Sequence, residues 1–305
     1  MTNVALIIVL ISAFMHAGWN LFSKSKNPSG SFFFIASFAA ALLLSPVLIY
    51  SSNIFLDGLF PQRVWPLIIL TGLFQSSYFL CLAAAYRSGE MSVVYPLARS
   101  SPAIVIVVIT LFLGQGNEVT RLAIIGILLI VGGCFLVPIQ RFSELRLRNY
   151  LNATCVLALF TAIGTTGYSI VDDKALNILR NTPELQELGN THVTLIYAGL
   201  QSLSTLFWIF LYIVIRRKNR DEFKQQIKDD IKSPILAGVA IQITYLLVLI
   251  AYAYSSNVSY IVGFRQISIP LGALLGIIVL KEKAPRTKIL GVSIVVVGLV
   301  LVAVF

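Results

Sequence analysis

Apolar runs of about 20 residues, separated by short groups of charged and turn-forming residues, dominate the sequence. A helix needs about 20 mainly apolar residues to cross the roughly 30 Å hydrocarbon core of a bilayer. Residues 30–50, GSFFFIASFAAALLLSPVLIY, form one such run without a charged side chain. Only 12% of the 305 residues are charged, whereas about a quarter are charged in a water-soluble domain. The sequence therefore predicts an integral membrane protein and excludes a soluble fold.

Ten segments meet this length requirement when the chain is divided at charges and turn residues. They are residues 4–23, 30–50, 65–86, 91–113, 121–139, 150–171, 193–215, 233–254, 258–280 and 287–305. The eighth and ninth are divided at Ser255, Ser256 and Asn257, because residues 233–264 carry no charge. The N-terminal run MTNVALIIVLISAF lacks the Lys or Arg that begins a signal peptide, so we expect a retained first span.

Basic residues predict the orientation. Most of the 23 Lys and Arg residues follow odd-numbered segments, whereas Arg63, Arg121, Lys174 and Arg180 follow even-numbered ones. Cytoplasmic connections carry the excess of Lys and Arg in membrane proteins. We therefore expect the odd connections in the cytoplasm and both termini outside. The expected location is the plasma (inner) membrane of a bacterial cell.

Two connections are longer than the rest. Residues 177–191 are expected to form an external loop. The basic run RRKNRDEFKQQIKDDIK, residues 216–232, has Phe223, Ile227 and Ile231 at helical spacing. A short helix on the inner surface is therefore one interpretation of this run. A solvated loop is the favoured interpretation.

An internal repeat is the strongest indication of architecture. AYRSGEMSVVYPLARSSP, residues 85–102, aligns without gaps with AYSSNVSYIVGFRQISIP, residues 253–270. Further on, LGQGNEVT aligns with LKEKAPRT, and the final segments share a Gly-x6-Gly pattern at Gly126 and Gly133 and at Gly291 and Gly298. Because five spans is an odd number, the second copy must be inverted. Inverted repeats are typical of secondary transporters, which bind their substrate near the midplane and work by alternating access.

The predicted domains follow from this repeat: residues 1–140 as the first five-helix repeat, 141–149 as a basic linker and 150–305 as the second repeat. The fold class predicted is an all-α polytopic membrane protein, with ten transmembrane helices in two inverted five-helix repeats around a central cavity.

Three motifs carry a family resemblance. AFMHAGWNLFSKS at the end of the first span, GYSIVDDKAL at the end of the sixth, and the paired Ala-Tyr and Pro motifs of spans four and nine are similar to the drug/metabolite transporter superfamily, in particular its EamA-like ten-helix members. The resemblance covers essentially the whole chain. It implies a cavity lined largely by spans one, three, four, six, eight and nine. The first repeat departs from the family at LGQ, residues 113–115, because relatives commonly have an acidic residue there, as the second repeat of this chain has at Glu282.

Two arginines lie inside predicted spans, Arg99 in the fourth and Arg265 in the ninth. Each is about 12 Å from the start of its helix, and a charge at the bilayer centre costs about 2.5 to 3.5 kcal/mol on insertion scales. No Asp or Glu is expected in the central part of any span. Guanidinium groups bind carboxylate or phosphate bidentately, so the pair predicts an anionic organic substrate. The alternative is that carbonyls, water or hydroxyl groups satisfy each arginine.

Other polar residues inside the spans complete the predicted site. His16, Trp19 and Asn20 share one side of the first span, where His16 could couple transport to protons or make a helix-packing hydrogen bond. Pro102 and Pro270 are predicted hinges, with ordinary kinking as the alternative. The predicted substrate-binding residues are Arg99, Arg265, His16, Trp19, Asn20, Gln75, Tyr78, Tyr95, Gln242, Tyr245 and Gln266. Interhelical hydrogen bonding is the alternative for the uncharged members.

The remaining acids and cysteines predict no further site. Asp172 and Asp173 are expected at the solvated outer end of span six, and Cys81, Cys134 and Cys155 are expected to be small buried hydrophobes without a metal. Gly272 and Gly276 form a GxxxG pattern, which we expect to pack within the monomer.

The function predicted is secondary transport of a small polar, anionic metabolite, with efflux as open as uptake. No Walker A sequence occurs, so ATP hydrolysis by this chain is not expected, and no HExxH or GxSxG occurs, so no catalytic residue is expected. No cofactor and no nucleic-acid partner are expected either. The expected partners are the small-molecule substrate, with possible proton coupling, and the lipid bilayer; the chain is a monomer or homodimer. The alternatives are an intramembrane enzyme or flippase acting on a lipid-linked substrate, and a non-transporting membrane component.

Overall fold

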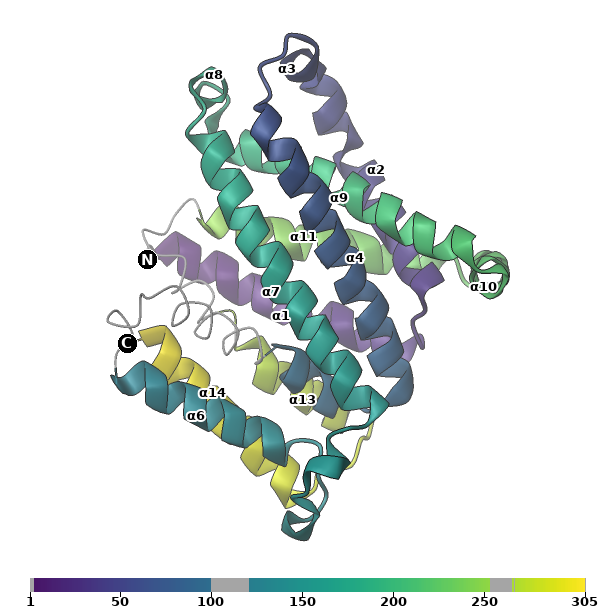
Figure 1. The fold of residues 1–305 in the computed structure, drawn as a ribbon, viewed down its shortest axis with the longest axis vertical. Coiled ribbons are helices and arrows are strands. Elements are labelled where there is room, and N and C mark those ends of the chain that lie inside the picture. The colour runs from purple at the N-terminus through teal and green to yellow at the C-terminus, as the bar shows by residue number, and fades with distance from the viewer. Residues whose placement is uncertain (1–2, 100–120, 253–264, 266, 305) are drawn as a thin grey trace.

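All regular structure in the described residues is helical, as the computed structural model in Figure 1 shows. The structure describes residues 3–99, 121–252, 265 and 267–304. The longer helices are α1 (Asn3–Ser25), α2 (Gly30–Tyr50), α4 (Trp65–Ser88), α6 (Arg121–Leu136), α7 (Ala153–Arg180), α9 (Gly189–Ile215), α10 (Arg217–Asp229), α11 (Lys232–Tyr252), α13 (Ser268–Ile278) and α14 (Arg286–Val304). The short ones are α3 (Ser52–Leu56), η1 (Gln62–Val64), η3 (Phe142–Glu144), η4 (Leu147–Asn149) and α8 (Pro183–Gln186). Residues 91–99 are helical as well.

Within the described residues, six helices are long and apolar enough to cross a membrane: α1, α2, α4, α7, α9 and α11. They coincide with predicted spans one, two, three, six, seven and eight. The shorter apolar helices α6 and α13 fall within predicted spans five and nine. Because spans four and nine extend into residues outside the described part, the count of ten stays a prediction.

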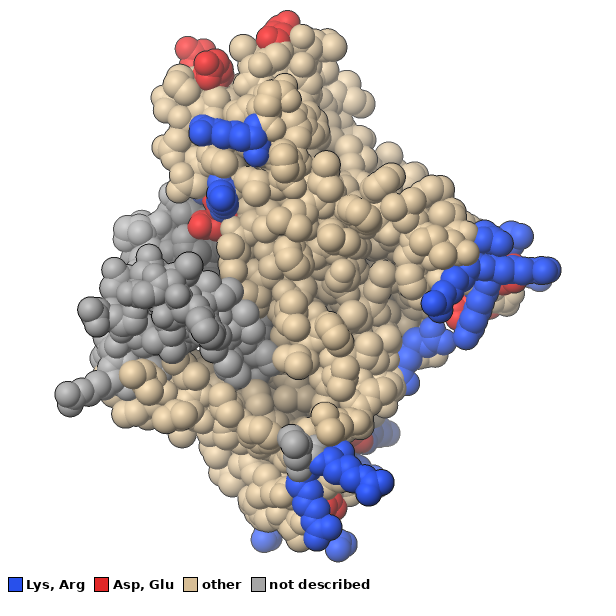
Figure 2. Space-filling model, in the orientation of Figure 1, with Lys and Arg blue, Asp and Glu red and all other residues tan. Residues whose placement is uncertain are grey.

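The distribution of side chains is that of a protein solvated by lipid. Large apolar side chains face outward, such as Leu128 on α6, which is 65% exposed, and Phe207 on α9, which is 54% exposed. Polar side chains such as Thr71, Gln201 and Gln242 are buried. Lys and Arg are rarely on these apolar faces; Figure 2 shows them gathered over α10 and around η3 and η4, with acidic residues over α3 and α8. The chain is therefore an integral membrane protein.

The sixth span is longer than predicted. The sequence places its end at residue 171, before the charged group DDK, but α7 continues to Arg180. The reason is an apolar stripe beyond these charges, Ala175, Leu176 and Leu179, which is almost completely buried. The expected external loop over residues 177–191 is wrong for the same reason, because α7, α8 and α9 occupy most of it.

The favoured interpretation of the basic run after α9 is also wrong. Residues 217–229 form helix α10 rather than a loop. The ring of Phe223 packs edge-on against Phe34 of α2, with 5.3 Å between ring centroids. This apolar contact on one face of α10 stabilises the short helix that the spacing of Phe223, Ile227 and Ile231 offered as the alternative.

Helix packing is symmetric under exchange of the predicted repeats. α4 packs on α7 as α1 packs on α11, and α4 packs on α9 as α2 packs on α11. The pairs α2 with α9 and α6 with α14 also form. When α1, α2, α4 and α6 are exchanged in order with α7, α9, α11 and α14, the first four pairings are converted into one another, and the pairs α2 with α9 and α6 with α14 are converted into themselves.

Glycines bring α6 and α14 into backbone contact. A Cβ atom at Gly133 would lie 2.7 Å from the carbonyl oxygen of Gly291, and one at Gly298 would lie 2.5 Å from that of Gly126. The two Gly-x6-Gly patterns thus face each other in antiparallel register. On α13, a Cβ at Gly272 would lie 2.5 Å from the ring of Tyr95, so this part of the GxxxG pattern packs within the chain.

Candidate functional site

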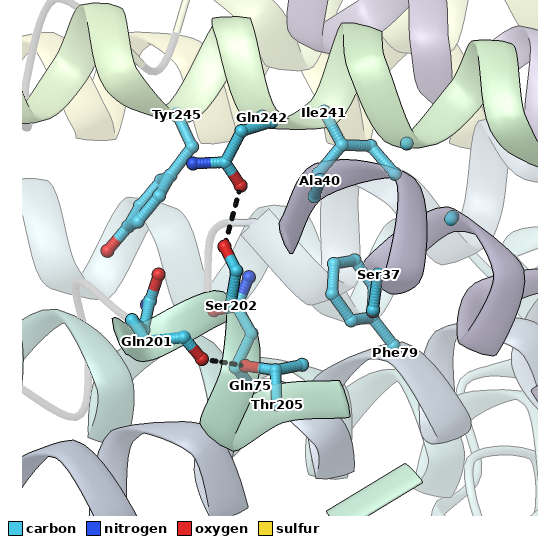
Figure 3. Close-up of a pocket in the computed structure, with 12 residues that line it drawn as sticks. Ser37, Ala40, Gln75, Phe79, Gln201, Ser202, Thr205, Ile241, Gln242 and Tyr245 are labelled. Atoms are coloured by element: carbon cyan, nitrogen blue, oxygen red, sulfur yellow. Dashed lines mark hydrogen bonds between the residues drawn. The ribbon is translucent and has the colours of Figure 1, made fainter. Parts of the chain in front are cut away.

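Two neighbouring cavities lie among the helices. The first, shown in Figure 3, has an empty volume of about 360 Å³ between α2, α4, α9 and α11. Its lining is uncharged: Ala36, Ser37, Ala40, Gln75, Phe79, Gln201, Ser202, Thr205, Gly238, Ile241, Gln242 and Tyr245. Ser202 donates a hydrogen bond of 3.0 Å to Oε1 of Gln242 across it. This cavity can solvate polar groups without offering a charge.

The second cavity is charged and aromatic, with an empty volume of about 270 Å³. It is lined by His16, Trp19, Gln75, Tyr78, Phe79, Tyr168, Ile241, Thr244, Tyr245 and Arg265. Six of the predicted site residues are among these: His16, Trp19, Gln75, Tyr78, Tyr245 and Arg265. Gln75, Phe79, Ile241 and Tyr245 border both cavities, so the two are adjacent.

Both predicted arginines are buried. Arg99 is 5% exposed and Arg265 is 6% exposed. Arg265 borders the second cavity, just before α13. Arg99 belongs to the helical residues 91–99, and its Nε has no hydrogen-bond partner among the described residues. The structure thus places one guanidinium on the cavity and the other in the interior.

The residues of the first span have different surroundings. Trp19 donates from Nε1 to Nδ1 of His16 at 3.2 Å, and both side chains line the second cavity. Asn20 donates to the carbonyl of His16 at 2.8 Å and accepts a 2.8 Å bond from the hydroxyl of Tyr86 on α4. Asn20 is therefore engaged in helix packing, away from the cavity lining.

The other predicted residues lie nearby or outside the described part. The ring of Tyr78 meets that of Tyr168 edge-on at 5.8 Å, and the ring of Tyr95 lies 6.0 Å from that of His16. Pro270 lies in the first turn of α13, where a missing N–H costs no helical hydrogen bond. A turn at Ile267 precedes it. Pro102 and Gln266 lie outside the described residues.

Asp172 is the interior group that the sequence analysis placed wrongly. It is 1% exposed and lies about two helical turns before the end of α7. Oδ1 accepts hydrogen bonds of 2.5 Å from Thr71 of α4 and from Tyr197 of α9. Oδ2 accepts a 3.3 Å bond from Gln201 of α9 and another from the hydroxyl of Tyr245 of α11. The expectation of a solvated Asp172, and of no acid inside any span, is therefore wrong.

One signal in the sequence points to this position. Asp172 follows Tyr168 by four residues and precedes Leu176 by four, so the three share one helical face. Both neighbours are buried, whereas Asp173 is exposed. The four donors could not be foreseen, because they come from three other helices.

A second charged group, which we call the end network, lies where α4 and α13 end. It consists of Glu90, Ser92, Glu282 and Lys288. The carboxylate of Glu282 accepts from the backbone N–H groups of Met91 at 2.6 Å and Ser92 at 2.7 Å, at the start of helical residues 91–99. Lys288 is buried and donates to Glu90 at 2.5 Å and to Ser92 Oγ at 2.8 Å. The acid of the LKE motif thus caps a helix of the other half of the chain.

The cysteines and possible metal ligands add no site. Cys81, Cys134 and Cys155 are only partly buried, rather than fully buried as expected. Among the described residues, no group of three or more His, Cys, Asp or Glu side chains could hold a metal ion.

The fold and these interior cavities define a polytopic helical membrane protein with polar sites inside its bundle. Residues 3–139 match the model of the EamA-like transporter family, part of the drug/metabolite transporter superfamily. This match suggests a membrane transporter of the drug/metabolite type. A comparison with curated proteins gave no match.

Proposed function

We propose that the protein carries a small polar, anionic organic metabolite across the plasma (inner) membrane by alternating access. The observation that carries the proposal is Arg265, a buried guanidinium on the wall of an interior cavity. A charge in the interior of a membrane protein is costly, so it marks a solute pathway by default. A planar guanidinium binds carboxylate and phosphate groups bidentately.

The other side chains of the second cavity suit the rest of such a solute. Tyr78, Tyr168 and Tyr245 bring aromatic faces with hydroxyl groups, and Gln75 brings a buried amide oxygen without a hydrogen-bond partner among the described residues. The anionic group would bind Arg265 and the polar remainder would reach Gln75. Arg99 would add a second positive charge from the neighbouring segment.

Alternating access is supported by the exchange symmetry of the helix pairs. Two inverted halves that contact each other through equivalent surfaces can rock about a shared site. We place the halves at residues 1–140 and 150–305, joined by the basic linker 141–149, with Pro270 and Pro102 as hinges. The distribution of Lys and Arg favours the end with α10 and the linker as cytoplasmic.

Thermal stability of the purified protein in detergent tests the substrate class. Anionic, zwitterionic and cationic metabolite pools are compared on wild type, Arg265→Gln and Arg99→Gln, with exposed Arg63→Gln as the matched control. A ligand at about 100 times its Kd stabilises the folded state by about 2.7 kcal/mol. We expect the anionic pool to stabilise wild type and Arg63→Gln, and neither of the other variants. Stabilisation only by neutral or cationic compounds would contradict the proposal.

A further inference from the structure

The buried carboxylate of Asp172 has no role in the binding of an anion. Four donors from α4, α9 and α11 converge on it, two on each oxygen: Thr71, Tyr197, Gln201 and Tyr245. Arg265, on the cavity that Tyr245 also lines, acts on Asp172 electrostatically. The four donors supply the direct hydrogen bonds that solvate a negative charge here.

The chemistry of the four donors allows a proton to bind. A protonated carboxyl group is itself a donor and needs an acceptor, so one neighbour must reverse its hydrogen bond. The hydroxyl groups of Thr71, Tyr197 and Tyr245 can accept, whereas the amide nitrogen of Gln201 cannot. Of these, Tyr245 also borders both cavities, so a proton on Asp172 can change what its hydroxyl offers to a bound solute.

The charged surroundings give the direction of the coupling. The titratable groups that face Asp172 are Tyr197 of α9 and Tyr245 of α11, and Arg265 lies on the cavity that Tyr245 lines. Exposed Arg63 near η1 and Asp173 and Lys174 on α7 point to the surface, and Arg180 donates to Thr194 at 2.9 Å. An anion that enters the cavity adds negative charge near the carboxylate and disfavours its ionised form.

We propose that Asp172 is the proton-coupling site: it takes up one proton when the anionic solute binds and releases it when the solute leaves. The step converts a carboxylate and a proton into a carboxylic acid, with no other bond made or broken. Proton and anion then cross the membrane in the same direction. This inference rests on the proposed function and assigns the coupling to Asp172 rather than to His16.

A proton-uptake measurement tests this assignment. The anionic pool, adjusted to the pH of a weakly buffered detergent solution of the protein, is added while a pH electrode records the change. We expect about one proton taken up per wild-type protein, none for Asp172→Asn, and one for Asp173→Asn, the exposed neighbour. Thermal stability is read in parallel, and the anionic pool should still stabilise Asp172→Asn.

Equal proton uptake by wild type and Asp172→Asn would overturn the assignment, as would stabilisation of wild type by anions without proton uptake. Absence of anion stabilisation in wild type would instead refute the proposed function, and the coupling with it. If Asp172→Asn fails to fold, Tyr245→Phe is used to test the assignment instead. Loss of one donor to the carboxylate should move the midpoint of proton uptake to higher pH, and an unchanged midpoint would overturn the proposal.

Discussion

The core region, α4, α7, α9 and α11 around Asp172, and the α6–α14 region are stabilised in different ways. In the core region, buried polar side chains bond to one another across helices, as the four donors to Asp172 show. In the α6–α14 region, helix backbones meet at glycines, and the charges lie at the end of the helix pair, where Lys288 meets Glu90. We infer that the core region serves solute binding, whereas the α6–α14 region is structural.

The largest effect on stability is expected in the core region. Asp172→Leu leaves Thr71, Tyr197 and Tyr245 without their acceptor, and each unsatisfied buried donor costs about 1–3 kcal/mol. We expect the free energy of unfolding to fall by about 3 kcal/mol or more, measured by denaturation in detergent. Asp173→Leu, at an exposed position, should change it by about 0.5 kcal/mol or less. Equal effects of the two substitutions would show that the buried network is not stabilising.

A steric change tests the α6–α14 region. The added Cβ of Gly133→Ala would lie 2.7 Å from the carbonyl oxygen of Gly291 and from Val295 Cγ2, so the helices must separate. We expect a loss of about 2 kcal/mol, in the range of overpacked sites. Gly132→Ala is the matched control, because a Cβ there has nothing within 4 Å. If both variants keep wild-type stability, backbone contact is not what holds this pair.

Removal of the charge at the end of the same region should cost less. Lys288→Met loses the hydrogen bonds to Glu90, Ser92 and the carbonyl of Lys283. Because Glu90 is 40% exposed, solvent screens the pair, and we expect a loss of about 1 kcal/mol. Exposed Lys281→Met should have almost no effect. A loss as large as that of Asp172→Leu would remove the distinction between the two regions.

The smallest effect is expected at the surface end of the core region. Oδ1 of Asp230 accepts from the backbone N–H of Ser233 at 3.0 Å, near the start of α11. Hydrogen bonds from Ser233 lower the pKa of Asp230. Since the folded pKa is below the unfolded one, near about 3.9, the stabilisation is complete above that pH and lost as pH falls through the folded pKa. The melting temperatures of wild type and Asp230→Ala should therefore differ slightly at pH 7 and converge in acid. A difference in melting temperature that grows in acid would contradict the lowered pKa of Asp230 in the folded state.

Much of the fold follows from hydropathy. The bounds of α2 match the predicted span at both ends, and those of α1, α4 and α11 lie within a few residues, because the length of apolar sequence decides where a membrane helix stops. The end of α7 differs from the prediction because the helix continues through the charged group at residues 172–174. A charged residue does not end a membrane helix where side chains of other helices bond to it, as they do to Asp172. Such partners cannot be identified from a linear pattern of residues.

The candidate site, like the fold, was predictable from the sequence only in part. His16, Gln75 and Arg265 stand out in the sequence as polar residues within apolar spans, and the structure brings them to one cavity. Asn20 has the same signal but packs against Tyr86 instead. Helical periodicity gives the side on which a residue lies, whereas the neighbouring helix decides whether that side faces a cavity or another side chain.

Transport itself is the most direct test of the central claim that Arg265 recognises an anionic solute. Wild type, Arg265→Gln and Arg63→Gln are reconstituted in liposomes, and uptake from the anionic, zwitterionic and cationic pools is followed by mass spectrometry of the liposome contents. We expect wild type and Arg63→Gln to accumulate members of the anionic pool and Arg265→Gln to accumulate none above protein-free liposomes. Uptake by Arg265→Gln at the wild-type rate, or accumulation of cations alone, would contradict the account.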